Sequence, residues 1–178
     1  MGYEFTANTA VSVDGLGTFA VDGFQLPTNE PVGLWDSGGN LLASTTLTTS
    51  DPVIVTPAGG SWVFAAITPV ALTAGDSYYV GSVGPEAYAY GFYGFPGFTV
   101  APSITYVQDA FGYGNYSVGT LSFPDATSSQ PGFTGFFGGN VELSPSTVTP
   151  EPGSYAALIL GFGGVMLVVR SRREKQRQ

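Results

Sequence analysis

The chain has 178 residues, among them 13 Asp and Glu, 5 Lys and Arg, and no His or Cys. Residues 1–148 hold all the acidic residues except Glu151 and Glu174, and they contain no Lys or Arg. This part therefore lacks the cationic contacts that nucleic acid requires, and we expect no nucleic-acid partner. The absence of Cys excludes disulfides and thiol chemistry.

The first half of the chain reads as short strands separated by turns. Residues 2–5 resemble a first strand, and residues 11–13 and 16–21 alternate between apolar and polar positions. The Asp14-Gly15 pair between the last two predicts a tight turn, and hence a meander. Residues 32–47 give the strongest hairpin prediction, because Ser37-Gly-Gly-Asn40 tolerates a positive φ between two apolar segments.

Further strands follow. Residues 62–67 are apolar on both faces, which predicts a central strand covered on both sides. Residues 70–72 lead to a turn at 73–76, and a strand returns at 77–82. Later strands are expected at residues 104–107 and 140–143, with a long loop over 123–139 between them.

No segment before Thr149 shows helical periodicity with caps. We therefore expect an all-β fold, an antiparallel β-sandwich of jelly-roll type. The predicted ectodomain covers residues 1–143, and a polar spacer covers residues 144–149.

Aromatic residues interleaved with glycine fill residues 88–98. Rings of this kind stack on the C–H faces of sugars, so we single out Tyr88, Tyr90, Phe92 and Tyr93 as a candidate glycan-stacking platform. Tyr106, Phe111, Tyr113 and Tyr116 are candidates to extend it. The alternative is a loop whose rings fold back over the sandwich.

Metal binding has a weaker signal. Asp14, Asp22, Asp36 and Asp76 lie at predicted turns, where a carboxylate and backbone carbonyls can ligate a structural Ca²⁺. No Asp-x-Asp-x-Asp-Gly loop is present, however, and turn aspartates commonly bond their own backbone. We therefore assign no metal site and no cofactor.

Catalytic chemistry has few residues available. Without His, Cys or a cation in residues 1–148, the usual bases, zinc ligands and nucleophiles are missing. A pair of carboxylates, as in glycoside hydrolysis, is the remaining possibility. We assign no catalytic residue and expect a protein that is not an enzyme, with a carboxylate-pair glycan hydrolase as the alternative.

The C-terminal segment is organised differently. Residues 153–169 are seventeen residues without a charge or a proline; as a helix they reach roughly 25 Å, close to a hydrocarbon core of about 30 Å. All the cations of the protein follow: Arg170, Arg172, Arg173, Lys175 and Arg177. The positive-inside rule then predicts a transmembrane helix with a cytoplasmic basic tail at 170–178 and the acidic domain outside. The alternative is a buried C-terminal helix of a soluble domain.

The order Pro150-Glu151-Pro152, short hydrophobic helix and arginine-rich tail resembles the PEP-CTERM sorting signal of bacterial exported proteins. The resemblance covers residues 149–178. It implies recognition by a membrane-embedded exosortase and processing near the motif, in a Gram-negative bacterium that makes an exopolysaccharide matrix. Members of that family carry an N-terminal signal peptide, whereas residues 1–6 have no basic or long apolar region. We therefore expect a further segment upstream.

Residues 11–82 resemble a β-sandwich domain of unknown function that occurs in bacterial surface proteins. The matching segments are Val13-Asp-Gly-Leu-Gly-Thr-Phe19, Val32-Gly-Leu-Trp-Asp-Ser-Gly-Gly-Asn-Leu-Leu-Ala-Ser44, Trp62-Val-Phe64 and Leu72-Thr-Ala-Gly-Asp-Ser-Tyr-Tyr-Val80. These are packing and turn residues, so the resemblance implies a fold and a surface location but no active site. The sequence thus predicts an exported envelope or extracellular-matrix protein, anchored in the inner membrane before processing and interacting with exopolysaccharide.

Overall fold

The structure is a computed structural model that describes residues 1–20, 26, 28–55, 61–83, 100–112, 120–127 and 138–145. All the strands in these ranges belong to one compact unit, Met1–Ser146. They are β1 (Gly2–Ala7), β2 (Val11–Phe19), β3 (Glu30–Asp36), β4 (Leu41–Leu47), β5 (Val53–Val55), β6 (Ser61–Leu72), β7 (Ser77–Ser82), β8 (Ile104–Ala110) and β9 (Gly139–Pro145). The described part contains no helix, which confirms the all-β prediction.

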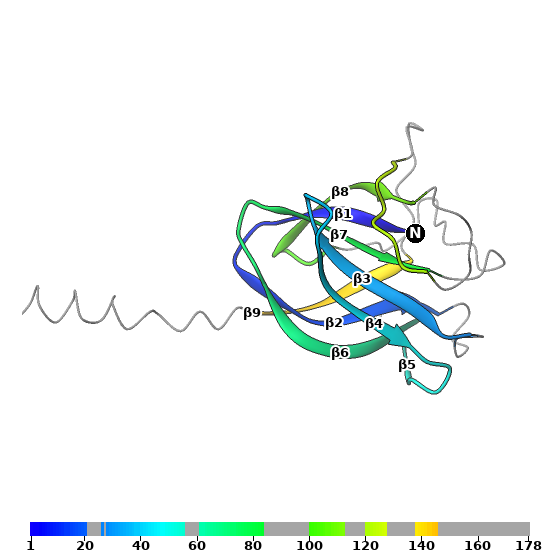
Figure 1. The fold of residues 1–178 in the computed structure, drawn as a ribbon. Coiled ribbons are helices and arrows are strands. Elements are labelled where there is room, and N and C mark those ends of the chain that lie inside the picture. Colours follow the sequence, from blue (N-terminus) through cyan, green and yellow to red (C-terminus); the bar gives the residue numbers. More distant parts are fainter. Residues whose placement is uncertain are drawn as a thin grey trace, which may run out of the picture. The chain divides into compact units, whose positions relative to one another are not determined.

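The strands form two antiparallel sheets in the described part of the chain. One has the order β4-β3-β7-β1-β8 and the other β5-β6-β2-β9. Figure 1 shows them as two layers, with β1, β7 and β8 in one and β2 and β6 in the other. Phe5, Val80 and Leu34 from the first sheet and Leu16 and Val63 from the second are buried in one cluster. The fold is therefore β-sandwich-like, with its core between the sheets.

The predicted hairpin at residues 32–47 is confirmed. β3 and β4 pair antiparallel, and Gly39 in the turn has a φ of +82°. The side chain of Asp36 accepts hydrogen bonds from the backbone N–H groups of Gly38 and Asn40, both at 2.9 Å. The turn is thus fixed by local contacts, which is why the local sequence sufficed to predict it.

The turn predicted at Asp14-Gly15 is wrong. β2 runs without interruption from Val11 to Phe19, and residues 14–15 form an irregularity in its pairing. Between Val13 and Gly15 the partner on β9 advances by one residue, from Leu143 to Glu142, so Asp14 is an extra residue. Glycine also suits bulges, and β2 is held extended because β6 and β9 pair along both of its edges.

β6 is longer than predicted, because residues 62–67 and 70–72 belong to one strand. The register against β2 shifts over the segment that contains Pro69, whose missing N–H suits such an irregularity. The expectation that both faces are covered is only half met: Val63 is fully buried, whereas Trp62 and Phe64 are half-buried. The turn at 73–76 is confirmed by a φ of +91° at Gly75.

Residues 120–127, which include the start of the predicted loop, lie over the outer face of the five-stranded sheet. The ring of Phe123 lies 5.0 Å from that of Tyr79 and 6.2 Å from that of Trp35, between centroids. An isolated bridge between Phe111 and Ala126 holds the segment near the end of β8.

Candidate functional site

The outer face of the four-stranded sheet carries a row of aromatic side chains. Phe19 on β2 pairs directly with Trp62 on β6, and their ring centroids lie 5.4 Å apart, edge to face. Phe64, two residues further along β6, has its centroid 6.4 Å from that of Trp62. Because their neighbours Thr18 and Val63 are fully buried, these three side chains point outward. All three are half-buried, so part of each ring meets solvent.

Two glycines of β2 form the floor beside these rings. A Cβ added to Gly17 would lie 2.5 Å from Cδ1 of Phe64, so that ring lies over Gly17. A Cβ added to Gly15 would lie 2.7 Å from Oε2 of Glu142 on β9, so that carboxylate lies over Gly15. Two residues along a strand span roughly 6.6 Å. An aromatic ring and a carboxylate therefore lie next to each other on this face.

The far end of the same face is polar. The hydroxyl of Ser12 donates to Oδ1 of Asp14 at 2.7 Å, and the hydroxyl of Ser144 donates to Oδ2. These two hydrogen bonds hold the pKa of Asp14 below its usual range. The face thus changes from aromatic at Trp62 to anionic at Asp14 and Glu142, and it offers apolar contact beside hydrogen-bond acceptors.

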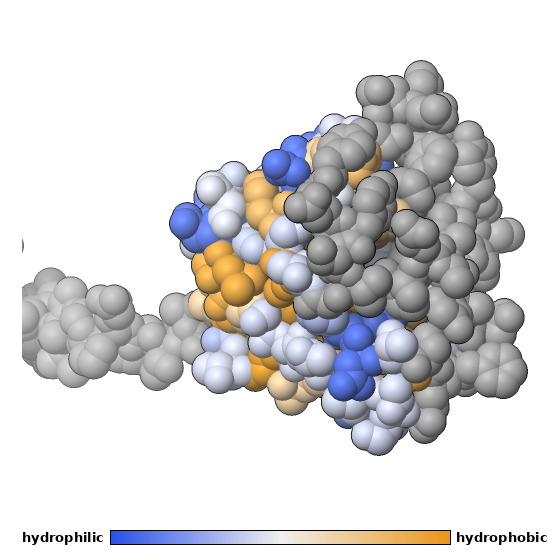
Figure 2. All heavy atoms as spheres, turned by 45° about the vertical axis from the view of Figure 1, so that its right-hand side comes forward, coloured by the Kyte–Doolittle hydropathy of each residue, from blue (hydrophilic) through white to orange (hydrophobic). Residues whose placement is uncertain are grey.

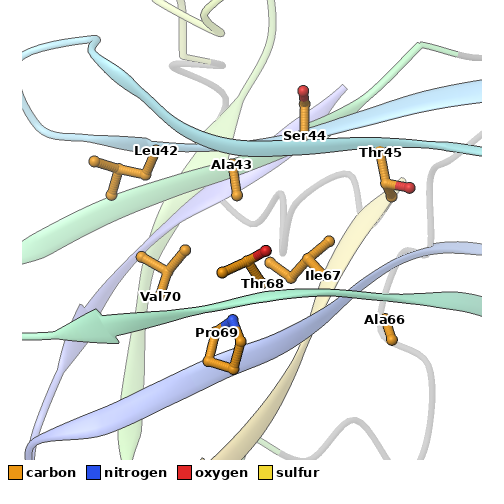
Figure 3. Close-up of a pocket in the computed structure, with 9 residues that line it drawn as sticks. All are labelled: Leu42, Ala43, Ser44, Thr45, Ala66, Ile67, Thr68, Pro69 and Val70. Atoms are coloured by element: carbon orange, nitrogen blue, oxygen red, sulfur yellow. The ribbon is translucent and has the colours of Figure 1, made fainter.

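A second feature is a hollow between β4 and β6, with a volume of about 460 Å³. In Figure 3, Ala43 and Thr45 point from β4 toward β6, Ile67, Thr68 and Val70 point back, and Ser44 points away. Leu42, Ala66 and Pro69 also line it, and no lining residue is charged. Leu41 and Leu42 are exposed on β4, the edge strand. Figure 2 shows patches of hydrophobic residues beside hydrophilic ones on the surface of the described part of the molecule.

The residues predicted to stack on glycans, Tyr88, Tyr90, Phe92 and Tyr93, lie outside the described residues. So do the sorting motif Pro150-Glu151-Pro152 and the cations from Arg170 to Arg177. Tyr106, a candidate to extend the platform, packs against the core, and its ring centroid lies 6.1 Å from that of Tyr3. Burial is the main cause that raises the pKa of Tyr106, to about 12. This residue is half-buried against the core of the sandwich.

The aspartates proposed for calcium are placed separately. Asp36 binds its own turn, and Nδ2 of Asn40 also donates to it at 2.8 Å; these bonds hold the pKa of Asp36 below its usual range. Asp14 lies on the bulge, Asp76 closes the turn at 73–76, and Asp22 lies outside the described residues. Among the residues that the structure describes, no three of His, Cys, Asp or Glu are grouped as metal ligands. The assignment of no metal site, with a structural Ca²⁺ as its alternative, stays a prediction.

Other carboxylates also accept hydrogen bonds within the fold. Oε2 of Glu4 accepts from Nε2 of Gln108 at 2.6 Å, and Asp51 accepts from the backbone N–H of Thr48 at 2.7 Å. Sequence reasoning missed the outer face of the four-stranded sheet, since it assigned Gly15 to a turn. A usable signal was present: Gly15, Gly17 and Phe19, like Trp62 and Phe64, recur with the period of two that places residues on one face.

Comparison with family models, with curated protein sequences and with solved structures finds no match to this chain. Among the described residues, no helix is both long and apolar enough to cross a membrane. The predicted span at 153–169 lies outside those residues. The function of this chain therefore rests on the charges of the sequence and the geometry of the sandwich.

Proposed function

We propose that this chain is a non-enzymatic, exported envelope or extracellular-matrix protein. In this proposal a jelly-roll-like sandwich stands outside the inner membrane of a Gram-negative bacterium, held by a transmembrane helix at residues 153–169. An exosortase recognises Pro150-Glu151-Pro152 and processes the chain near it. The released domain then serves as a structural or glycan-interacting module in an exopolysaccharide matrix.

The observation that carries the proposal is the separation of charge along the sequence. Residues 1–148 are anionic without a single Lys or Arg, and the five cations follow directly after the apolar segment at 153–169. Arginine near the end of an apolar helix favours the cytoplasmic side of a membrane. An anionic domain without internal counter-charge also repels further copies of itself and stays soluble outside the cell.

The non-enzymatic part of the proposal is supported by what the carboxylates do. Asp36, Asp51, Asp14 and Glu4 accept hydrogen bonds from turns, strands and neighbouring side chains. A glycosidase requires two carboxyl groups that face a substrate about 5 to 9.5 Å apart. Carboxylates that fix a turn or a sheet register are suited to the fold instead.

The test is intact mass and topology of the chain in a bacterium that carries an exosortase, with an export signal placed upstream. We expect a secreted form cut near Pro152, and accumulation of the uncut membrane form for Glu151→Ala. Glu142→Ala removes the same charge from the sandwich and should leave processing unchanged. A reporter fused after residue 140 that is active on the cytosolic side would overturn the proposal.

A further inference from the structure

We infer that the outer face of the four-stranded sheet, around Trp62, Phe64 and Glu142, binds an uncharged pyranose glycan. This inference rests on the proposed matrix function and assigns the glycan contact to residues other than those of the segment at 88–98. The elements of the site come from three strands, β2, β6 and β9, that pair with one another.

The rings supply the apolar contact. Trp62 is the largest side chain of the row, with Phe19 edge-on at one side and Phe64 further along its own strand. Fixed neighbours hold each ring, so a ligand does not have to order them on binding. The C–H faces of a pyranose are apolar and match the exposed face of a ring in shape and polarity.

The glycine floor lets the ring of Phe64 and the carboxylate of Glu142 lie close over β2. A side chain at Gly17 or Gly15 would occupy the positions now taken by the ring of Phe64 and the carboxylate of Glu142. These two groups come from the strands on either side of β2 and lie over two glycines that are roughly 6.6 Å apart along that strand. A sugar that stacks on Phe64 or Trp62 therefore places its ring edge, where the hydroxyls are, toward Glu142.

The charge of the face selects the class of glycan. Glu142 is exposed and Asp14 lies next to it, held by Ser12 and Ser144. Carboxylates accept hydrogen bonds from sugar hydroxyls, and charge-assisted bonds of this kind are the stronger ones. Uronic-acid polymers would place like charges against these groups and against a domain without cations, which costs binding energy. The face therefore fits a neutral polysaccharide.

The experiment uses the full chain in detergent micelles, with cellohexaose as the probe and hexagalacturonate as the charged comparison, followed by titration calorimetry. We expect binding of cellohexaose and none of hexagalacturonate. Trp62→Ala should weaken binding by about tenfold, the size expected for one ring contact. Glu142→Gln should also weaken it, by a smaller factor. Leu41→Ala, at an exposed apolar position on the other sheet, should bind as the wild type does.

Because Trp62→Ala removes a large half-buried side chain, Glu142→Gln serves as the variant whose fold is least disturbed, and circular dichroism checks both. Wild-type affinity in both variants together with loss of binding in Tyr88→Ala would overturn this inference and leave the proposed function standing. If no neutral glycan binds while the chain is still processed near Pro152, this inference is also overturned and the proposed function stands. Release of shortened sugars would instead favour the hydrolase and overturn both.

Discussion

The carboxyl group of Glu30 on β3 lies beside the hydroxyl of Thr18 on β2 in the interior between the two sheets, and that hydroxyl donates to the backbone oxygen of Gly138 at 2.8 Å. Both side chains are buried, at 2% and 0% exposure. The second carboxyl oxygen of Glu30, Oε2, has no hydrogen-bond partner within the described residues. Burial of a carboxyl oxygen without a hydrogen-bond partner destabilises the charged form of the carboxyl group.

Burial raises the pKa of Glu30 from its ordinary 4.5 to about 7, although the neighbouring Thr18 hydroxyl and the charge of the Met1 amino group act in the opposite direction. Between these pH values Glu30 keeps its proton in the folded protein and loses it in the unfolded chain. The contribution of Glu30 to the free energy of unfolding should therefore fall as the pH rises from about 4.5 to about 7 and then level off.

Glu30→Gln should remove this pH-dependent loss in the free energy of unfolding. Urea unfolding at several pH values should give a flatter profile for the variant and, at pH 8, a gain on the order of 2 kcal/mol over the wild type. Glu142→Gln leaves Glu30 in place and should keep the wild-type slope. A slope that persists in Glu30→Gln would show that another group causes it.

Gly17→Ala should destabilise the domain. The new Cβ would lie 2.5 Å from the ring of Phe64 and 2.6 Å from the backbone oxygen of Val63, so both must move. We expect a loss of about 1 to 3 kcal/mol in the free energy of unfolding. The matched control is Gly81→Ala on β7, where the nearest atoms lie 3.7 Å from the added Cβ. Equal stability of the two variants would argue against the contact between Phe64 and Gly17.

Asp36→Ala should lower the midpoint of thermal unfolding, because it leaves the N–H groups of Gly38 and Asn40 without their acceptor. Asp36→Asn keeps one side-chain oxygen and should retain most of the stability near neutral pH. The wild type should lose this contribution in acid, since the pKa of Asp36 is lowered by the same bonds. Identical melting curves for the two variants would contradict the assigned role of the side chain.

Phe123→Ala should expose Trp35, whose side chain is now 4% exposed. The protein has two tryptophans, so the experiment uses Trp62→Phe as the background and Trp35 is then the single reporter. We expect a red-shifted emission and stronger quenching by acrylamide once Phe123 is removed. Val107→Ala, an exposed position on β8, serves as control. Unchanged emission would mean that Trp35 is covered by other residues.

The sequence by itself determined the features that are set within a few residues. The hairpin around Ser37-Gly-Gly-Asn40 and the turn ending at Asp76 were predicted because Gly39 and Gly75 supply a positive φ and Asp36 binds its own turn. Apolar alternation likewise indicated strands and an all-β fold. The separation of acidic and basic residues, on which the proposed function rests, is also a property of the sequence alone.

The tertiary structure decided what depends on partners distant in the chain. Asp and Gly suit both turns and bulges, and only pairing with β6 and β9 on both edges of β2 makes Asp14 a bulge. The register of those same strands places Phe64 over Gly17 and Glu142 over Gly15. Glu30 became a buried acid because a second sheet covers it with Thr18. Each of these contacts joins strands whose register no local pattern specifies.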